Sequence, residues 1–214
     1  MIDFSRIFLQ YGDLMTTAIR EHILICVVSL VLGFIIAFPL GIYLTKNKTL
    51  STVVLNLFSV VNTIPSLVLL GVAMMVFGLG FWTAVSVLFV YSLLPILRNT
   101  YTGIVEVDPQ YVKIARGLGM NSWQILIRVQ IPLALPTIIS GLRLSAVYII
   151  SWATLAALIG AGGLGDLIWM GLQSYNYDLI FAGSIPATLM ALLVSFLLTL
   201  LEHFVSKSRR GVTS

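Results

Sequence analysis

The side chains best suited to recognition chemistry gather in a polar segment, from Arg98 to Arg143, that interrupts long apolar runs of this 214-residue chain. Within it, Asp108 and Pro109 predict the start of a short helix, because aspartate caps helix N-termini and proline fits the first turn. Gly119 then suits the left-handed backbone conformation that ends many helices. The apolar residues of this helix share one side, and they are Tyr111, Ile114, Ala115 and Leu118. We interpret the helix as a docking element for a soluble partner.

A second short helix is predicted beyond the glycine, with Asn121 or Ser122 as its cap. Its residue Trp123 suits two positions: a contact that anchors the helix near the partner, or the membrane interface, where tryptophan is common. Pro132 and Pro136 are expected to end this helix and to lead into the next membrane span. Two short helices would therefore meet at a glycine bend.

Residues suited to catalysis are few and form no recognisable constellation. His22 and His203 lie at the ends of apolar runs, and Cys26 is the only cysteine, so an intrachain disulfide or a cysteine metal cluster is excluded. The sequence contains no Ser/His/Asp set, metal-ligand spacing or phosphate-binding GxxxxGKS/T segment. We therefore expect a chain that is not an enzyme, binds no metal or cofactor itself and leaves ATP hydrolysis to another polypeptide.

The composition places most of the chain in a lipid bilayer. Apolar residues make up 59% of it and charged residues 9%, and the mean hydropathy is +1.05. A spanning helix needs about 20 apolar residues, and the longest run is divided by Gly78–Gly80. The chain is therefore predicted to form one all-α membrane domain, residues 1–214, with a loop at 105–136 and five spans near residues 22–45, 52–77, 81–102, 137–160 and 179–205.

Two features inside the predicted spans break the apolar pattern. Asn62, Thr63 and Pro65 should bend or break the second span, since proline removes a backbone hydrogen bond that neighbours must replace. Arg143 lies just inside the fourth span, where its charge should snorkel to the headgroups or pair internally.

The distribution of positive charge predicts the orientation, because Lys and Arg remain on the cytoplasmic side of membranes. The loops after the first span, around the insert and at the chain's end are basic, through residues that include Lys46, Lys48, Lys207, Arg209 and Arg210. The N-terminal stretch has only Arg6 and Arg20, and residues 161–178 have no Lys or Arg. We expect the N-terminus outside and the C-terminus in the cytoplasm. The net charge of +4 follows from this topology and does not indicate nucleic-acid binding.

Two stretches of the insert resemble a known family. Ala115–Gly119 (ARGLG) and Val129–Pro136 (VQIPLALP) are similar to the EAA loop of permease subunits of bacterial ATP-binding-cassette importers. Lys113 and Ile114 stand where that family has its glutamate and first alanine, whereas Ala115, Gly119 and Pro132 match the pattern. The resemblance implies that the ATPase is contacted through Tyr111, Val112, Lys113, Ile114, Ala115, Arg116, Gly117, Leu118, Gly119, Trp123 and Pro132.

Two further stretches, Val61–Leu67 (VNTIPSL) and Ile159–Gly165 (IGAGGLG), resemble the osmoprotectant permeases that import glycine betaine, carnitine and choline. The resemblance implies a type I importer permease-like fold in the bacterial cell membrane, with the coupling loop on the cytoplasmic face. Such a permease forms half of the translocation pore, beside a second permease in a homodimer or heterodimer. The other implied partners are an extracytoplasmic substrate-binding protein and two copies of a cytoplasmic ATPase that binds ATP and Mg.

Two alternatives are weighed against this function. Permeases for methionine or other amino acids are expected to have five similar spans and a similar insert. An ion-coupled secondary transporter, by contrast, would carry ionisable residues at mid-membrane and often paired half-repeats, and the sequence shows neither.

Aromatic and polar residues in or near the spans are the candidates for the translocation path. A quaternary ammonium ion offers no hydrogen bond through nitrogen, so aromatic faces are its natural partners. Helix packing and interfacial belts are the competing roles for aromatic residues. The candidates for the path are Asn62, Pro65, Tyr91, Tyr148, Trp152 and Trp169.

Small residues predict two faces where helices approach closely. Gly33, Ala37 and Gly41 recur every four residues in the first span, and Gly183 and Ala187 do so in the fifth. Such faces serve either a contact between two permeases or packing within one chain, and the sequence leaves both open.

Overall fold

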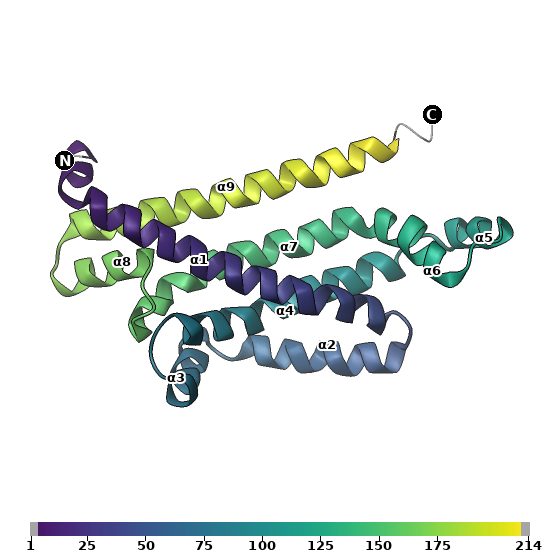
Figure 1. Cartoon of the computed structure of the whole chain (residues 1–214), viewed down its shortest axis with the longest axis horizontal. Coiled ribbons are helices and arrows are strands. Elements are labelled where there is room, and N and C mark those ends of the chain that lie inside the picture. Colours follow the sequence, from purple (N-terminus) through teal and green to yellow (C-terminus); the bar gives the residue numbers. More distant parts are fainter. Residues whose placement is uncertain (1–3, 211–214) are drawn as a thin grey trace.

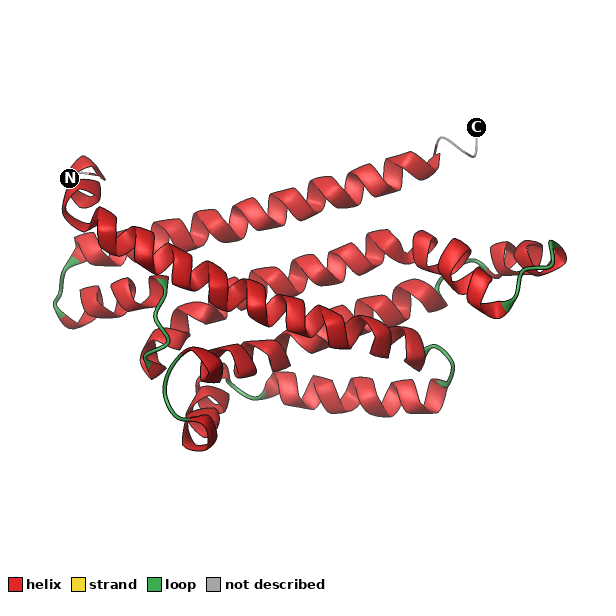
Figure 2. Ribbon diagram, in the orientation of Figure 1, coloured by secondary structure: helices red, strands yellow, loops and turns green. Residues whose placement is uncertain are grey.

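The computed structural model describes the backbone of residues 4–210 and the side chains of residues 9–207. Every regular element in this part of the chain is a helix (Figure 2). The elements are α1 Phe4–Leu44, α2 Lys48–Thr63, α3 Ser66–Phe77, α4 Phe81–Val105, α5 Pro109–Gly117, α6 Ser122–Ile125, η1 Leu126–Gln130, α7 Ile131–Ala153, η2 Thr154–Ile159, α8 Leu164–Gln173 and α9 Tyr177–Arg210. The side chains of Arg6, Arg209 and Arg210, used above for the orientation, lie outside the described residues.

Long helices run side by side in an elongated bundle (Figure 1). Four stretches of residues 9–207 are long and apolar enough to cross a membrane, and the bent pair α2 and α3 makes a fifth candidate. α5 and α6 project from one end of the bundle, and α8 lies at the other (Figure 1). We call these the α5 end and the α8 end. The predicted all-α membrane fold is confirmed.

The predicted break in the second span is confirmed. α2 ends at Thr63, α3 begins at Ser66, and the two helices are bent by 94°. Pro65 has no N–H to continue the helical ladder, and Ile64 adopts an extended backbone with φ −66° and ψ 129°. Only α2 therefore runs along the bundle, while α3 turns away from it (Figure 1).

The region between the last two long helices is more ordered than the sequence indicated. Residues 161–178, expected only as an outer loop, contain the ten-residue helix α8. A Cβ at Gly165 would lie 1.9 Å from the carbonyl oxygen of Thr154, so glycine is required for this close approach. Likewise, a Cβ at Gly183 would lie 2.6 Å from the Leu164 carbonyl oxygen, which places this small face of α9 against α8. The contact is intramolecular.

The small-residue face of α1 also packs within the chain. A Cβ at Gly33 would lie 1.8 Å from Ser92 Oγ, and one at Gly41 would lie 2.8 Å from Thr100 Cβ, both on α4. Ser92, Thr100 and Ala37 are fully buried. Of the two uses left open by the sequence, packing within one chain is therefore the one observed for this face, because close approach to α4 leaves no room for a side chain.

Alanine at Gly33 is expected to destabilise the bundle, because the added methyl group would overlap the buried Ser92. Overpacking of this kind costs about 1–3 kcal/mol, which corresponds to a fall in melting temperature of about 2–12 °C for a chain of this size. Thermal unfolding of the purified protein in detergent measures the change.

Gly71→Ala is the matched control, because Gly71 is also helical but a methyl group added there would have no neighbouring atom within 4 Å. Alanine there should be neutral or stabilising, since alanine favours helix over glycine by about 1 kcal/mol. Equal melting temperatures for the two variants would contradict the assigned α1–α4 contact.

Candidate functional site

The projecting α5 end begins with a well-capped helix. Asp108 Oδ1 accepts a hydrogen bond from the Gln110 N–H at 2.8 Å, and Pro109 occupies the first turn. Both features match the predicted helix start. The helix ends at Gly117, and Gly119 adopts the left-handed conformation with φ +80°. The Met120 N–H then donates to the Ala115 carbonyl at 3.1 Å, so the chain reverses in a compact turn.

The second short helix begins in a reciprocal cap. Asn121 Oδ1 accepts from the Gln124 N–H, and Gln124 Oε1 accepts from the Asn121 N–H, each at 2.9 Å. Asn121, one of the two candidates, is therefore the cap. The cap and the Gly119 turn fix where α5 points relative to α6.

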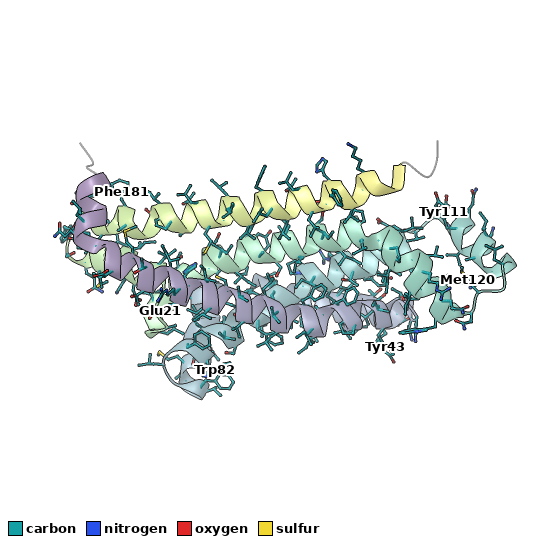
Figure 3. The ribbon with its side chains drawn as sticks, turned by 45° about the horizontal axis from the view of Figure 1, so that its top comes forward. Glu21, Tyr43, Trp82, Tyr111, Met120 and Phe181 are labelled. Atoms are coloured by element: carbon teal, nitrogen blue, oxygen red, sulfur yellow. The ribbon has the colours of Figure 1, made fainter. Side chains whose placement is uncertain are left out.

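The apolar side of α5 is mostly uncovered by the rest of the chain. Ala115 is only 3% exposed, but Tyr111, Ile114 and Leu118 are 46%, 61% and 74% exposed. Lys113, Arg116, Gly117 and Gly119 are also exposed, and Val112 is half-buried. Figure 3 shows Tyr111 and Met120 at the extreme end of the molecule. An apolar surface of this kind, projecting from the bundle and edged by positive charge, is typical of a protein-docking site.

The expectation that Pro132 and Pro136 end the second helix is wrong. α6, the π-helical turn η1 and α7 follow one another without a break, and Ser122–Ile159 forms a single long candidate span. The wider π-helical turn directly precedes Pro132, which falls in the first turn of α7, so the ring meets no regular α-helical ladder there. The projecting α6 is thus the direct helical extension of α7.

Trp123 extends from α6 toward the end of α1. It is 67% exposed and lines a pocket of about 420 Å³ together with Pro39, Tyr43 and Lys46. An indole beside a lysine at the end of a membrane helix suits the interface position. Its exposed ring also leaves room for a partner, so both roles remain predictions.

Three of the six path candidates form one aromatic group. The ring of Trp152 lies 4.4 Å from that of Tyr91 and stacks on that of Tyr148 at 5.3 Å, centroid to centroid. The Tyr91 hydroxyl donates to the carbonyl oxygen of Ile64, at the break between α2 and α3. Asn62 and Pro65 flank this break. Trp169 lies elsewhere, on α8.

Two arginines near the α5 end were only partly anticipated. Arg143 on α7 pairs with Glu202 on α9 at 3.1 Å and donates to Thr199 at 2.7 Å. The internal pair is therefore the alternative observed. Arg98 on α4, taken from the sequence as a flank of the insert, instead donates from Nη2 to Ser59 Oγ on α2 at 2.8 Å. Sequence spacing gave no sign of this contact, because the two residues are joined only by the packing of α2 on α4.

A polar cluster at the α8 end was also missed. Glu21 Oε2 on α1 accepts from the Gly163 N–H at 2.9 Å and so ties the glycine turn before α8 to α1. The next residue, His22, is fully buried, and its Nε2 lies 3.1 Å from the Ile150 carbonyl oxygen. Burial and the nearby Glu21 carboxylate raise the pKa of Asp166 on α8. Gly162 and Gly163, with φ of +82° and +90°, form the turn that brings the Gly163 N–H to Glu21.

Residues 24–211 match the family described as binding-protein-dependent transport system inner membrane component. The chain belongs to this family. It is therefore a multi-pass membrane component of a transport system that uses a binding protein. Membership argues against the ion-coupled secondary transporter weighed above.

Relatives in this family are named for osmoprotectant transport. The chain is 44% identical to the carnitine transport permease protein OpuCB of Listeria monocytogenes over 92% of this chain and 90% of the relative. It is 43% identical to the glycine betaine/carnitine/choline transport system permease protein OpuCB of Bacillus subtilis, over 87% and 86%. The resemblance drawn from VNTIPSL and IGAGGLG is confirmed.

The fold also matches solved ABC transporter structures. A chain of the MetNI methionine ABC transporter in an inward-facing conformation aligns with a TM-score of 0.80, covering 92% of this chain and 98% of that one. An amino acid ABC transporter aligns with a TM-score of 0.74, covering 95% and 99%. Both structures are only 22% identical to this chain in sequence. The alignments therefore show a shared fold and carry no information on substrate.

Alanine at Gly119 is expected to loosen the α5–α6 turn. A left-handed backbone costs a residue with a Cβ about 1 kcal/mol, so amide hydrogen exchange of residues 118–122 should accelerate about fivefold. Hydrogen exchange with mass spectrometry of the permease in detergent makes the measurement.

Gly117→Ala is the control, because both glycines have open space around them and only Gly119 has a positive φ. Exchange in that variant should be unchanged or slower. Identical acceleration in both variants would show that the φ of Gly119 does not set the turn.

Proposed function

We propose that this chain is the permease subunit of an ATP-driven importer for quaternary ammonium osmoprotectants, the class of glycine betaine, carnitine and choline. The observation that carries the proposal is the match, over most of the chain, to relatives named for these solutes. Their identities exceed 40%, whereas the methionine transporter is similar at 22%. The osmoprotectant assignment is therefore favoured over an amino-acid permease.

The α5 end would be the coupling site. Two copies of a separate ATPase subunit bind ATP and Mg, and each would receive one α5 through the exposed Tyr111, Ile114 and Leu118. Because α6 continues through η1 into α7, a push on α5 and α6 would tilt a whole membrane helix. The energy of ATP would thus reach the path through packing, with no cofactor bound by this chain.

The remaining partners follow from the same assignment. A second permease, identical or homologous, would complete the pore, and an extracytoplasmic binding protein would deliver the solute to the α8 end. The α5 end would face the cytoplasm, with the N-terminus outside and the C-terminus inside. The positive charges of Lys46, Lys48 and Lys207 support this orientation.

Uptake of labelled glycine betaine, carnitine and choline by proteoliposomes tests the proposal. The vesicles carry this chain with its ATPase, binding protein and any second permease, with and without ATP. ATP-dependent accumulation of at least one of the three solutes is expected. An assembled complex that hydrolyses ATP but accumulates none of them would refute the substrate class.

Leu118→Asp tests the docking surface in the same vesicles. A charge placed on this exposed leucine should weaken ATPase binding, measured by co-purification, about tenfold or more, because it must be desolvated at the interface. Thr49→Asp adds the same charge to an exposed site at the α5 end but off α5, and it should leave binding intact. An equal loss of ATPase binding in the two variants would show that the ATPase does not dock on the apolar side of α5.

Cysteine labelling tests the orientation. The native Cys26 is buried, so an added cysteine dominates the reaction with a membrane-impermeant thiol reagent. Ser174→Cys should be labelled from outside intact cells, and Thr49→Cys only after the membrane is opened. The reverse pattern would overturn the orientation.

A further inference from the structure

Arg98 directs its charged group along the surface of α2 and away from the α5 end. Its Cα is three residues, about 4.5 Å of helix rise, from Tyr101, whose hydroxyl contacts Ser51 in the first turn of α2 at 3.0 Å. Its guanidinium, however, binds Ser59, eight residues or about 12 Å farther along α2. The side chain therefore points away from the α5 end and toward the middle of the bundle. This is the opposite of snorkelling to the headgroups near Lys48.

The charge of Arg98 has no counter-ion in the part of the chain whose side chains are described. Among residues 9–207 the guanidinium pairs with no carboxylate, and its one acceptor there is the Ser59 hydroxyl. Arg143, by contrast, is neutralised by Glu202. Arg98 lies within the candidate membrane span Phe81–Val105, where an arginine with a single neutral partner is costly unless water or an anion reaches it. The Arg98 side chain is exposed, so such access is open.

The surroundings of Arg98 differ from the lipid-like surfaces of the molecule. Arg98 and Tyr91 are seven residues apart on one face of α4, where α2 contributes Ser59 and α7 contributes Trp152 and Tyr148. Asn62, three residues after Ser59, has a buried side-chain nitrogen without a partner. The outer surface of α9 is instead purely apolar, formed by Leu189, Leu192, Leu193, Phe196, Leu197 and Leu200. The α2–α4–α7 face is therefore the side suited to a polar solute.

The two ends of this face have complementary chemistry. The guanidinium at Ser59 and the Tyr91 hydroxyl at Ile64 are five residues apart along α2, about 7 Å. A quaternary ammonium is attracted to an aromatic ring within about 6 Å of its centroid, and a carboxylate binds guanidinium at about 2.8 Å. A small zwitterion whose carboxylate binds Arg98 therefore has, farther along α2, the aromatic group that starts at Tyr91 and includes Trp152 and Tyr148 as the proposed partner of its ammonium.

We propose that Arg98 binds the carboxylate of the solute as it passes the α2–α4–α7 face, and thereby favours zwitterions over cations. Glycine betaine and carnitine carry a carboxylate beside the trimethylammonium group. Choline carries a neutral hydroxyl, which can accept one hydrogen bond but supplies no negative charge to offset the repulsion between its ammonium and the guanidinium. Arg98 is thus a specificity-determining residue in the membrane path. This inference rests on the proposed function for its substrate class.

Arg98→Gln tests the selectivity. In the proteoliposome assay with an unchanged binding protein, the ratio of glycine betaine to choline uptake should fall about tenfold relative to the unsubstituted transporter. The uptake ratio of Arg98→Lys should lie between those of Arg98→Gln and the unsubstituted transporter, because lysine keeps the charge but loses the planar guanidinium that binds a carboxylate through two hydrogen bonds. Arg143→Gln is the matched control for loss of an arginine, and it should leave the ratio unchanged because its partner is Glu202. An unchanged ratio in Arg98→Gln, or an unsubstituted transporter that imports choline but no zwitterion, would overturn the proposal.

A second measurement tests the position without any transport. Arg98→Cys in the assembled complex should react with a small water-soluble thiol reagent, because a solute path along this face must admit water. Leu192→Cys on the apolar surface of α9, where the leucine is 62% exposed, should not react. If Arg98→Cys is as unreactive as Leu192→Cys, Arg98 does not face a path. If the transporter imports none of the three solutes but Arg98→Cys reacts, the proposed substrate class fails while the hydrated position of Arg98 stands.

Discussion

The absence of water in the bilayer is the constraint on which the rest of this structure depends. Each buried N–H and C=O group must find a partner within the protein, which is why residues 4–210 form helices and short turns. Where the ladder breaks, at Ile64 and Pro65, the freed carbonyl of Ile64 accepts from Tyr91. Charged side chains in the bundle also need partners for the same reason, so the partner that each one has bears on its role. Arg143 is matched by Glu202, and Arg98 is held only by a serine among the side chains described.

The α5 end solves a different problem, because it must be stiff and also partly apolar in water. Stiffness comes from the caps at Asp108 and Asn121 and from the continuous helix that joins α6 to α7. The apolar side of α5 remains exposed, since Ala115 alone of its apolar stripe is buried. A rigid helix with an uncovered apolar surface can transmit force only when a partner covers it. This geometry suits a subunit whose motor is another polypeptide.

Close packing places the aromatic and polar residues that we propose for the path. Glycines at 33 and 41 bring α1 close to Ser92 and Thr100 of α4, while other positions of α4 pack on α2 and α7. Tyr91 then reaches Trp152 on α7 and Ile64 at the α2 break at once. The residues proposed to line the path are thus positioned by the packing of α4 against α1, α2 and α7.

Local chemistry along the chain determined the membrane class, the break at Pro65, the start of α5 at Asp108 and the left-handed Gly119. Each depends on neighbours within a few residues, and the same holds for the stretches that resemble the importer family. Only the tertiary structure decided that α6 continues through Pro132, that residues 164–173 form a helix, and that Arg98 meets Ser59. Those outcomes depend on how distant helices pack. A proline, a glycine or an arginine has several acceptable environments, and the sequence spacing alone does not select one.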